Sequence, residues 1–397
     1  MARVATFLLI LMLCGCSSMS DSLRNGVIDL MATTEEDESR PPKELEEITQ
    51  QVVIDQLWQR NVGAGQGKSF LKLEMVVSGD SLYIADYKGY VFSLDKISGE
   101  ERWEVDTTLA ISGALGVGDE NLFFGTTDAE VVALKLNDGD TSWTSDVSGE
   151  VLSIPQFDEE IVVVRTGDGA VTALEAESGQ EKWSFVSDVP ALSLRGTSSP
   201  VIKKGGVLTG YANGNLLVLR LKDGMQIWQT SIATPKGRGA LSRMVDVDAD
   251  PLAGERYVYA ATYNGGLVAV DVRNGEIVWR RSDLSSYKKM AADWLSLYVI
   301  DINDHIVAQD QNDGALKWQQ DKFEYRQLTS PVLVDDYLLT ADFEGYLHIL
   351  STEDGRVLGR VKVSSSPIKQ IPLVDEGVIY VQDVDGEVTA LRLKMAE

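Results

Sequence analysis

A repeated pair of short strands constrains this chain more than any other feature of its sequence. The stretch from Asp168 to Trp183 reads as two strands around a tight turn, because Val171 and Ala173 alternate with polar neighbours as a half-buried strand requires. Gly179 supplies the turn, since glycine reaches positive φ without steric cost. Trp183 then follows as a large apolar anchor in the second strand. The same pattern recurs along the chain, so this stretch is a repeat unit.

Six copies keep both the turn glycine and the tryptophan. A seventh copy has Gly359 where the tryptophan is expected, which predicts looser packing in that repeat, and an eighth, beginning at Asp385, stops after its first strand. Residues 56–59 read like the missing tryptophan strand, so we expect the N-terminal strand to complete the last repeat and close a ring. The six complete pairs are Gly99/Trp103, Gly139/Trp143, Gly179/Trp183, Gly224/Trp228, Gly275/Trp279 and Gly314/Trp318.

The period of the repeat predicts the fold. Successive tryptophans of the six copies lie 40, 40, 45, 51 and 39 residues apart, and Trp58 lies 45 residues before the first. Each unit also carries an earlier pair of strands, as in residues 199–202 and 206–211. A period of about 40–45 residues with four short strands is typical of propeller blades. We therefore predict an all-β fold, an eight-bladed β-propeller of four-stranded blades over residues 52–397, with the tryptophans packing between blades.

The charge of the chain narrows its partners. Its 397 residues carry 36 Lys and Arg against 61 Asp and Glu, a net charge of −25. A surface this acidic repels phosphate backbones, so the composition argues against nucleic-acid binding. It leaves neutral or basic protein surfaces as partners.

The N-terminus carries the features of a lipoprotein. Residues 1–15 combine Arg3 with a short apolar run and read as a signal peptide, because the run is too short to span a bilayer. Residues 13–16, Leu-Cys-Gly-Cys, resemble a bacterial lipobox, so we expect Cys16 to be the lipid-attachment site and the outer membrane to be the destination. Residues 16–51 are polar and acidic, which predicts a lipidated flexible tether. Cys16 is then the only cysteine left, which excludes a disulfide within the mature chain.

Two adjacent repeats carry long insertions after their tryptophan strands. The first covers residues 184–197 and the second residues 230–256, and both should emerge on the same face of neighbouring blades. Leu192 and Leu194 have no evident core partner, and Arg195 can bind a carboxylate with two N–H groups. Apolar anchors beside an arginine are typical of interface hot spots. The alternative is that both insertions are ordinary long loops, with the leucines tucked beneath them.

Three aspartates in the second insertion alternate along the chain: Asp246, Asp248 and Asp250. They lack the glycine and glutamate that an EF-hand calcium loop needs at its sixth and twelfth positions. On an extended strand, alternate side chains point to the same side. The pattern therefore favours an acidic contact strip over a metal site.

No constellation in the sequence indicates catalysis. The two histidines, His305 and His348, lie in or beside strands without a paired cysteine or histidine, and structural or surface roles are expected for both. There is no Gly-x-Ser-x-Gly elbow, P-loop or metal-ligand cluster. We predict a protein that is not an enzyme and that needs no cofactor or metal.

The repeat resembles the tryptophan-docking repeat of pyrroloquinoline-quinone dehydrogenases, although those enzymes are longer and carry extra loops. Over nearly its whole length the chain is more similar to the propeller lipoproteins of the bacterial β-barrel assembly machine, the outer-membrane protein assembly factor B family. The resemblance is carried by the lipobox, the tether, the eight repeats and the segments 192–196, 243–248, 263–267 and 328–332.

That resemblance implies a non-enzymatic scaffold. It would dock on the periplasmic POTRA domains of the barrel-inserting subunit and assist delivery of unfolded outer-membrane proteins. The implied partner-binding residues are Leu192, Leu194, Arg195, Asp246 and Asp248, all within the two insertions. Two alternatives stay open: a periplasmic quinoprotein or other protein that binds a ligand in the central funnel, and an anchored module that binds peptides by adding strands at blade edges.

Overall fold

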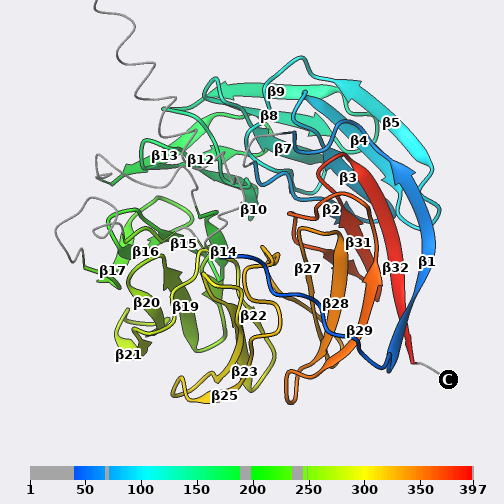
Figure 1. Ribbon diagram of the computed structural model, residues 1–397. Helices are drawn as coiled ribbons and strands as arrows, with labels where there is room; N and C mark the ends of the chain where they lie inside the picture. The colour runs from blue at the N-terminus through cyan, green and yellow to red at the C-terminus, as the bar shows by residue number, and fades with distance from the viewer. Residues whose placement is uncertain (1–39, 68–70, 188–197, 235–244, 248, 396–397) are drawn as a thin grey trace, which may run out of the picture. The chain divides into compact units, whose positions relative to one another are not determined.

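The chain folds into eight four-stranded antiparallel sheets, which form the blades of a propeller (Figure 1). The computed structural model describes residues 40–67, 71–187, 198–234, 245–247 and 249–395. Every regular element in these ranges is a β-strand, and the ranges contain no helix that could cross a membrane. The predicted all-β, eight-bladed propeller is confirmed.

Blades 1 to 4 follow one another along the chain. Their strands are, for blade 1, β2 (Val76–Ser78), β3 (Ser81–Ala85), β4 (Tyr90–Asp95) and β5 (Glu101–Asp106); for blade 2, β6 (Gly116–Val117), β7 (Asn121–Gly125), β8 (Glu130–Lys135) and β9 (Thr141–Asp146); for blade 3, β10 (Gln156–Asp158), β11 (Ile161–Arg165), β12 (Ala170–Glu175) and β13 (Glu181–Val186); and for blade 4, β14 (Val201–Lys203), β15 (Gly206–Gly210), β16 (Asn215–Arg220) and β17 (Gln226–Ser231).

Blades 5 to 8 continue the ring, and the last blade borrows the first strand of the chain. Their strands are, for blade 5, β18 (Leu252–Ala253), β19 (Tyr257–Thr262), β20 (Gly266–Asp271) and β21 (Ile277–Arg281); for blade 6, β22 (Ala291–Ala292), β23 (Ser296–Ile300), β24 (Ile306–Asp310) and β25 (Leu316–Gln320); for blade 7, β26 (Val332–Val334), β27 (Tyr337–Ala341), β28 (Tyr346–Ser351) and β29 (Val357–Lys362); and for blade 8, β30 (Leu373–Asp375), β31 (Val378–Gln382), β32 (Glu387–Met395) and β1 (Val52–Asn61).

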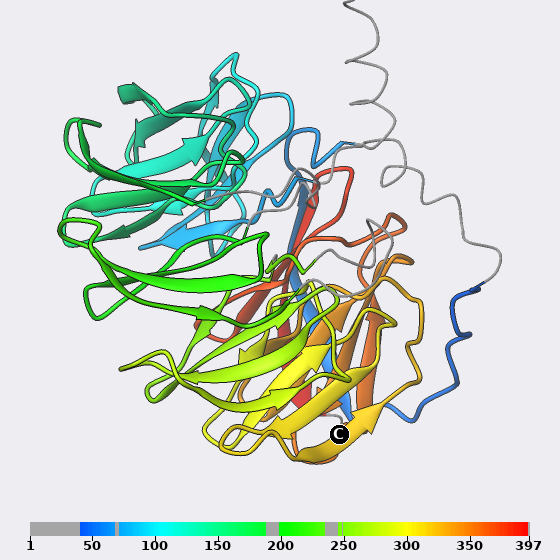
Figure 2. The same cartoon turned by 90° about the vertical axis from the view of Figure 1, so that its left-hand side faces the viewer.

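The blades are packed face to face around a central channel. The short first strands of neighbouring blades lie beside one another, as β10 lies beside β6 and β14, so these strands form the inner ring of the propeller (Figures 1 and 2). Because each blade is covered on both faces, its two middle strands are buried on both sides. The half-buried strand predicted around Val171 is therefore wrong in this respect: all residues of β12 except Glu175 are buried, including the polar Thr172.

The hydrophobic core is divided into eight clusters, and each lies between two adjacent blades. The cluster between blades 3 and 4, for example, joins Val163 and Trp183 to Tyr211 and Leu217. A single blade therefore cannot bury its own apolar faces, and the eight blades depend on one another for their stability.

Seven of these interfaces contain the same contact between a tryptophan and a turn. The indole lies over the turn glycine of the next blade, where an added Cβ would stand only 2.5–2.9 Å from a ring atom. Each of the seven glycines has a positive φ, between 68° and 76°, so the turn requires glycine for its backbone as well as for its contact. Each indole N–H donates to a backbone carbonyl of the next blade at 2.7–3.2 Å. The tryptophans are Trp58, Trp103, Trp143, Trp183, Trp228, Trp279 and Trp318.

The N-terminal strand closes the ring, as the sequence predicted. β1 pairs with β32 in antiparallel register from Val52 opposite Met395 to Asn61 opposite Glu387, with a bulge between Gln56 and Trp58. Trp58 then docks on Gly99 of blade 1 like the other tryptophans.

Residues 42–51, the N-terminal strap, lie against blade 7 and the connection between blades 6 and 7 without forming regular secondary structure. Lys43 N donates to Glu324 O at 2.9 Å, and Gln51 N donates to Leu358 O at 2.7 Å. Leu45 packs against the hydrophobic cluster between blades 6 and 7. These contacts hold this part of the chain on the propeller directly before the closing strand.

The strap explains the missing eighth tryptophan. The third and fourth strands of blade 8 are the two ends of the chain, so no turn joins them and blade 7 has nothing on which to dock an indole. At Gly359 an added Cβ would collide with the carbonyl oxygen of Val52 and would stand 3.1 Å from Gln50 Oε1. The side-chain amide of Gln50 instead makes two hydrogen bonds to the backbone of Arg360, accepting from its N–H at 3.0 Å and donating to its carbonyl at 2.8 Å. The looser packing predicted at Gly359 is therefore wrong.

Replacing Gly359 with alanine tests this contact. We expect Gly359→Ala to lower the free energy of unfolding by about 1–3 kcal/mol, because the new methyl group must displace backbone. The measurement is urea unfolding followed by circular dichroism. Gly167→Ala is the matched control, since the nearest atom to its Cβ would be 3.8 Å away, and it should be neutral or stabilising by up to about 1 kcal/mol. Equal effects of the two substitutions would contradict a strap that is pressed against β29.

Candidate functional site

The two insertions predicted as a partner-binding site join blade 3 to blade 4 and blade 4 to blade 5. Cys16, Leu192, Leu194, Arg195 and Asp248 lie outside the described residues, whereas Asp246 and the ends of both insertions are described. Each insertion runs from the outer strand of one blade to the inner strand of the next, so its two ends lie on the same face of the ring. The predicted common face is confirmed for these ends.

The downstream end of the first insertion is anchored by a buried arginine. Arg165 is 4% exposed and its guanidinium lies 3.0 Å from the hydroxyl of Ser198. The same guanidinium lies over the ring of Tyr211 at 4.8 Å from the centroid. Burial raises the pKa of Tyr211 to about 12, although the charge of Arg165 acts in the opposite direction. The first residue after the insertion is thus held between blades 3 and 4.

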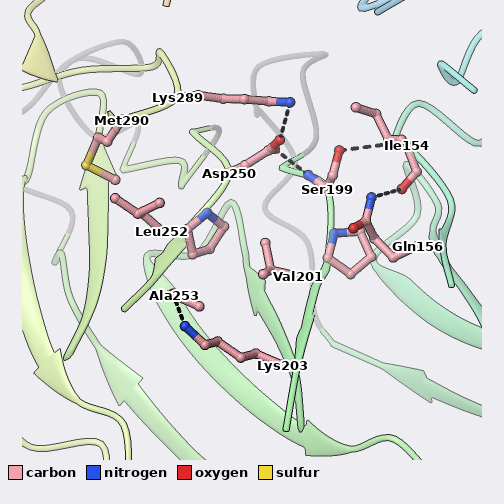
Figure 3. A pocket seen from close by; sticks show the side chains of 12 residues that line it. Ile154, Gln156, Ser199, Val201, Lys203, Asp250, Leu252, Ala253, Lys289 and Met290 are labelled. Atoms are coloured by element: carbon pink, nitrogen blue, oxygen red, sulfur yellow. Dashed lines mark hydrogen bonds and ion pairs between the residues drawn. The ribbon is translucent and has the colours of Figure 1, made fainter. Parts of the chain in front are cut away.

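The downstream ends of the two insertions are bonded to each other. Ser199 N donates to Asp250 Oδ1 at 2.6 Å, and Ser199 Oγ accepts from Ile154 N at 3.0 Å (Figure 3). Three neighbouring blades are therefore linked at the start of their inner strands.

A charged network extends from this junction across the central channel. Lys289, which precedes β22 of blade 6, lies 3.0 Å from Asp250 Oδ2 and 2.7 Å from Glu74 Oε2. Glu74 precedes β2 of blade 1, so the network joins blades on different sides of the ring. Figure 3 shows Lys289 reaching Asp250 beside Ser199. A lysine between two carboxylates satisfies charges that would otherwise be costly to bury.

The network changes the proton affinities of its members. Burial alone would raise the pKa of Asp250, but the charges of Lys289 and Lys72 and the N–H of Ser199 outweigh it, so the pKa lies below its usual value. Burial alone would lower the pKa of Lys289, but Asp250 and Glu74 outweigh it and the pKa is raised. Both groups are therefore charged throughout the neutral range.

Asp246 is 1% exposed, so its side chain is not part of an open acidic surface. Its carbonyl accepts from Tyr263 N at 3.3 Å, and Val247 N donates to Tyr211 O at 3.4 Å. This segment is therefore wedged between blades 4 and 5. The predicted acidic strip is wrong for Asp246 and Asp250, because both carboxylates are buried; alternation places side chains on one side of a strand but does not decide whether that side meets solvent.

A cavity of about 320 Å³ opens beside this junction, on the inner strands of blades 3 to 6 (Figure 3). Apolar side chains such as Val201, Leu252 and Met290 line most of it, with Lys203 and Gln156 at its polar points. Its volume lies at the lower end of the range for small-molecule sites. Its strongest charges, on Asp250 and Lys289, neutralise each other, and Lys203 Nζ donates to Ala253 O at 2.8 Å.

The two histidines have structural surroundings. His348 is fully buried, bonds Asp342 at 2.9 Å and contacts the ring of Phe323, and burial lowers its pKa despite the carboxylate. His305 bonds Asp301, also at 2.9 Å. Over the described part of the chain, no cluster of three or more His, Cys, Asp or Glu side chains is placed to hold a metal ion.

Sequence reasoning missed the Glu74–Lys289–Asp250 network. Its three members come from separate repeats, and only the closed ring brings their side chains together. A detectable signal was that all three lie two residues before the inner strand of their blade, at a position where three other repeats carry the small residues Ala114, Ser199 and Ser330. The buried Arg165 was also missed; it ends β11 at the position where β15 has Gly210.

Removing the lysine should reveal the network through a pH-dependent loss of stability. At pH 7, Lys289→Met leaves Asp250 without its main cationic partner, and we expect the free energy of unfolding to fall by about 2–4 kcal/mol, as for other broken ion pairs with partial burial. Wild type keeps the contribution of the lowered Asp250 pKa down to the unfolded value of about 3.9. In the variant, burial is no longer outweighed by Lys289, so the pKa of Asp250 rises and the carboxylate takes up a proton as pH falls, which relieves the buried charge. The difference in the free energy of unfolding between variant and wild type should therefore narrow from pH 7 towards pH 4.

Urea unfolding at both pH values measures this gap. Lys182→Met, on the exposed side of β13, is the control and should change stability by no more than about 0.5 kcal/mol. A gap for Lys289→Met that stays constant between the two pH values would contradict a stabilising charge network.

Comparison with known proteins places the chain in a family. A profile described as outer membrane protein assembly factor BamB matches residues 87–320 and 303–396. The chain is 44% identical over 355 residues to the BamB of Alkalilimnicola ehrlichii, covering 89% of this chain and 92% of the relative. It is 37% identical over 344 residues to the BamB of Escherichia coli, covering 84% and 88%.

Solved structures agree with this assignment. The crystal structure of BamB from Moraxella catarrhalis superposes with a TM-score of 0.78 at 25% identity, over 86% of this chain and 100% of that one. A europium-containing methanol dehydrogenase superposes with a TM-score of 0.71 at 12% identity, over 85% and 93%, which shows a shared fold alone. The matching profile and the high identity over most of both chains show that the chain belongs to the outer membrane protein assembly factor BamB family.

Proposed function

We propose that this protein is a non-enzymatic scaffold of the machinery that assembles outer-membrane proteins. Family membership supports the role, and its relatives are named outer membrane protein assembly factors. The observation that carries the mode of action is the junction of the two insertions, where Ser199 N meets Asp250 at 2.6 Å and the network continues to Lys289. Because this junction fixes the downstream ends of both insertions, we propose that the two insertions act as one preorganised surface.

The partner surface consists of the two insertions, and its partner is the periplasmic POTRA domains of the barrel-inserting subunit. Leu192 and Leu194 would supply apolar anchors, Arg195 would bind a carboxylate or carbonyl, and Asp248 would pair with a basic group. Asp246 has a different role, because its carboxylate is buried. It would position the second insertion rather than contact the partner.

The protein would act at the periplasmic face of the outer membrane. Cys16 would carry the lipid, and the tether would join the propeller at the strap on blade 7, where Lys43 and Gln51 are bonded to the blade. The strap and the insertions lie on different blades, so a membrane anchor at one side leaves the other side open to a partner. Two or more acyl chains give stable anchoring.

A pull-down tests the partner surface. The soluble form, residues 17–397, should bind purified POTRA domains, and Leu192→Ala, Arg195→Ala and Asp248→Ala should each weaken binding by roughly tenfold or more, as hot-spot truncations do. Asp246→Asn should weaken binding together with stability, which thermal unfolding of the same preparation would show.

The controls remove exposed charges outside the insertions. Arg356 and Asp140 lie in turns of blades 7 and 2. The variants Arg356→Ala and Asp140→Ala should bind the POTRA domains as wild type does. Binding that survives all insertion substitutions would move the interface elsewhere on the ring. Absence of binding by wild type would contradict the scaffold role and return attention to the channel cavity.

A further inference from the structure

Blades 4 to 6 carry exposed apolar residues at the start of the outer strand, where blades 1 to 3 carry polar ones; blade 8 has a single such residue, Leu57. The two residues before the docking tryptophan are polar in blades 1 to 3, as in Thr141–Ser142 and Glu181–Lys182. In blades 4 to 6 they include Ile227, Ile277–Val278 and Leu316, all of them exposed. The docking contact itself does not need these apolar residues, because blades 1 to 3 form it without them.

The one tryptophan outside the docking pattern lies on the same three blades. Trp294 is 89% exposed and the neighbouring Leu295 is 62% exposed, in the turn between β22 and β23. The turn is well held, because Asp293 accepts from Leu295 N at 2.8 Å and from Ser296 N at 2.7 Å. The same carboxylate accepts from Tyr298 Oη at 2.6 Å. A rigid turn therefore presents two large apolar side chains to solvent.

These residues lie at the same end of successive blades. Lys317, beside Leu316, donates to Leu295 O at 2.8 Å. Arg281 of β21 donates to Gly314 O at 2.8 Å, which joins blade 5 to the turn before β25. Figure 1 shows β17, β21 and β25 one after another along the outside of the ring. We call this set the apolar rim, and it comprises Met225, Ile227, Ile277, Val278, Trp294, Leu295 and Leu316.

The net charge of the chain is −25, and carboxylates near the apolar rim hold its cations in pairs. Its nearby cations are paired with carboxylates, as Arg281 is with Asp283 at 2.8 Å and Lys317 with Asp310 at 3.7 Å. Tyr298 also bonds Thr352 O, which places the turn of Trp294 beside the blade 7 turn that carries Glu353 and the ion pair of Asp354 with Arg356. An apolar surface in a negative field favours a partner that is apolar and basic.

We propose that the apolar rim of blades 4 to 6 binds an extended polypeptide segment whose apolar side chains are flanked by Lys or Arg. Resting on the proposed function, this assigns the rim to the unfolded cargo and leaves the insertions to the POTRA domains. An anionic membrane surface and a second copy of this chain fit less well, because the chain carries a net charge of −25 and both would add negative charge against it.

Fluorescence of Trp294 tests the assignment directly, because the other seven tryptophans are docked between blades. The probes are two twelve-residue peptides with alternating Leu, Tyr and Ser, one flanked by Lys and Arg and the other by Glu. With residues 17–397, the basic peptide should shift the emission to shorter wavelength and reduce quenching by acrylamide. The acidic peptide should bind roughly tenfold more weakly or not at all.

Variants separate the signal from the binding. With a labelled peptide, Trp294→Phe should lose the emission shift but keep its affinity. The double change Trp294→Ser with Leu295→Ser should weaken binding roughly tenfold or more, since two apolar anchors are lost. Ile97→Ser is the control, because Ile97 is an exposed apolar residue in the turn between β4 and β5 of blade 1, outside the apolar rim, and it should bind as wild type does.

Four results would overturn the assignment. The first two are wild-type affinity in the double serine variant and equal binding of the acidic and basic peptides. The third is an emission shift that appears with vesicles of phosphatidylethanolamine and phosphatidylglycerol but not with peptide. The fourth is a dimer of the wild-type protein in sedimentation that the double variant abolishes. The POTRA pull-down distinguishes the two proposals. Peptide failure with intact POTRA binding removes only the rim, whereas loss of POTRA binding in wild type removes the scaffold role.

Discussion

The contact between an indole and a glycine turn of the next blade is the interaction on which the rest of the structure depends. It requires a positive φ, the absence of a Cβ and a carbonyl for the indole N–H, and all three conditions recur at seven interfaces. Because each blade buries its faces only against its neighbours, the contact stabilises the fold only when the ring is closed. The repeat therefore specifies a scaffold and leaves the loops and outer edges free to differ.

Closure creates one irregular junction, and the chain uses its own N-terminus to fill it. Gly359 makes room where an indole has no turn to meet, and Gln50, Gln51 and Val52 occupy that place. By blade number, this junction between blades 7 and 8 lies across the ring from the insertions around blade 4. Glu74, Lys289 and Asp250 bridge the channel between these regions, so the anchor side and the proposed partner side belong to one connected body.

The sequence was sufficient for features that repeat and insufficient for those that depend on closure. The tryptophan period predicted the blades, and the fragment around Trp58 predicted the closing strand, because both signals are local. The strap was not predicted: Lys43 and Gln50 are polar residues without a period, and their partners lie some 280–310 positions away. Asp246 and Asp250 were expected at the surface, and their burial follows from neighbouring blades that no local pattern reveals. Trp294 had a readable signal, since it alone among the tryptophans after Trp58 lacks the preceding turn glycine.

The central claim is that function resides where the repeat is broken, and hydrogen exchange of the complex tests it most directly. The soluble protein is compared alone and with POTRA domains, and amide protection is mapped by mass spectrometry. We predict added protection at residues 184–200 and 230–250 and none in blades 1, 2 and 8. Protection that covers the apolar rim or the blades opposite the insertions, with residues 184–200 and 230–250 unchanged, would contradict it.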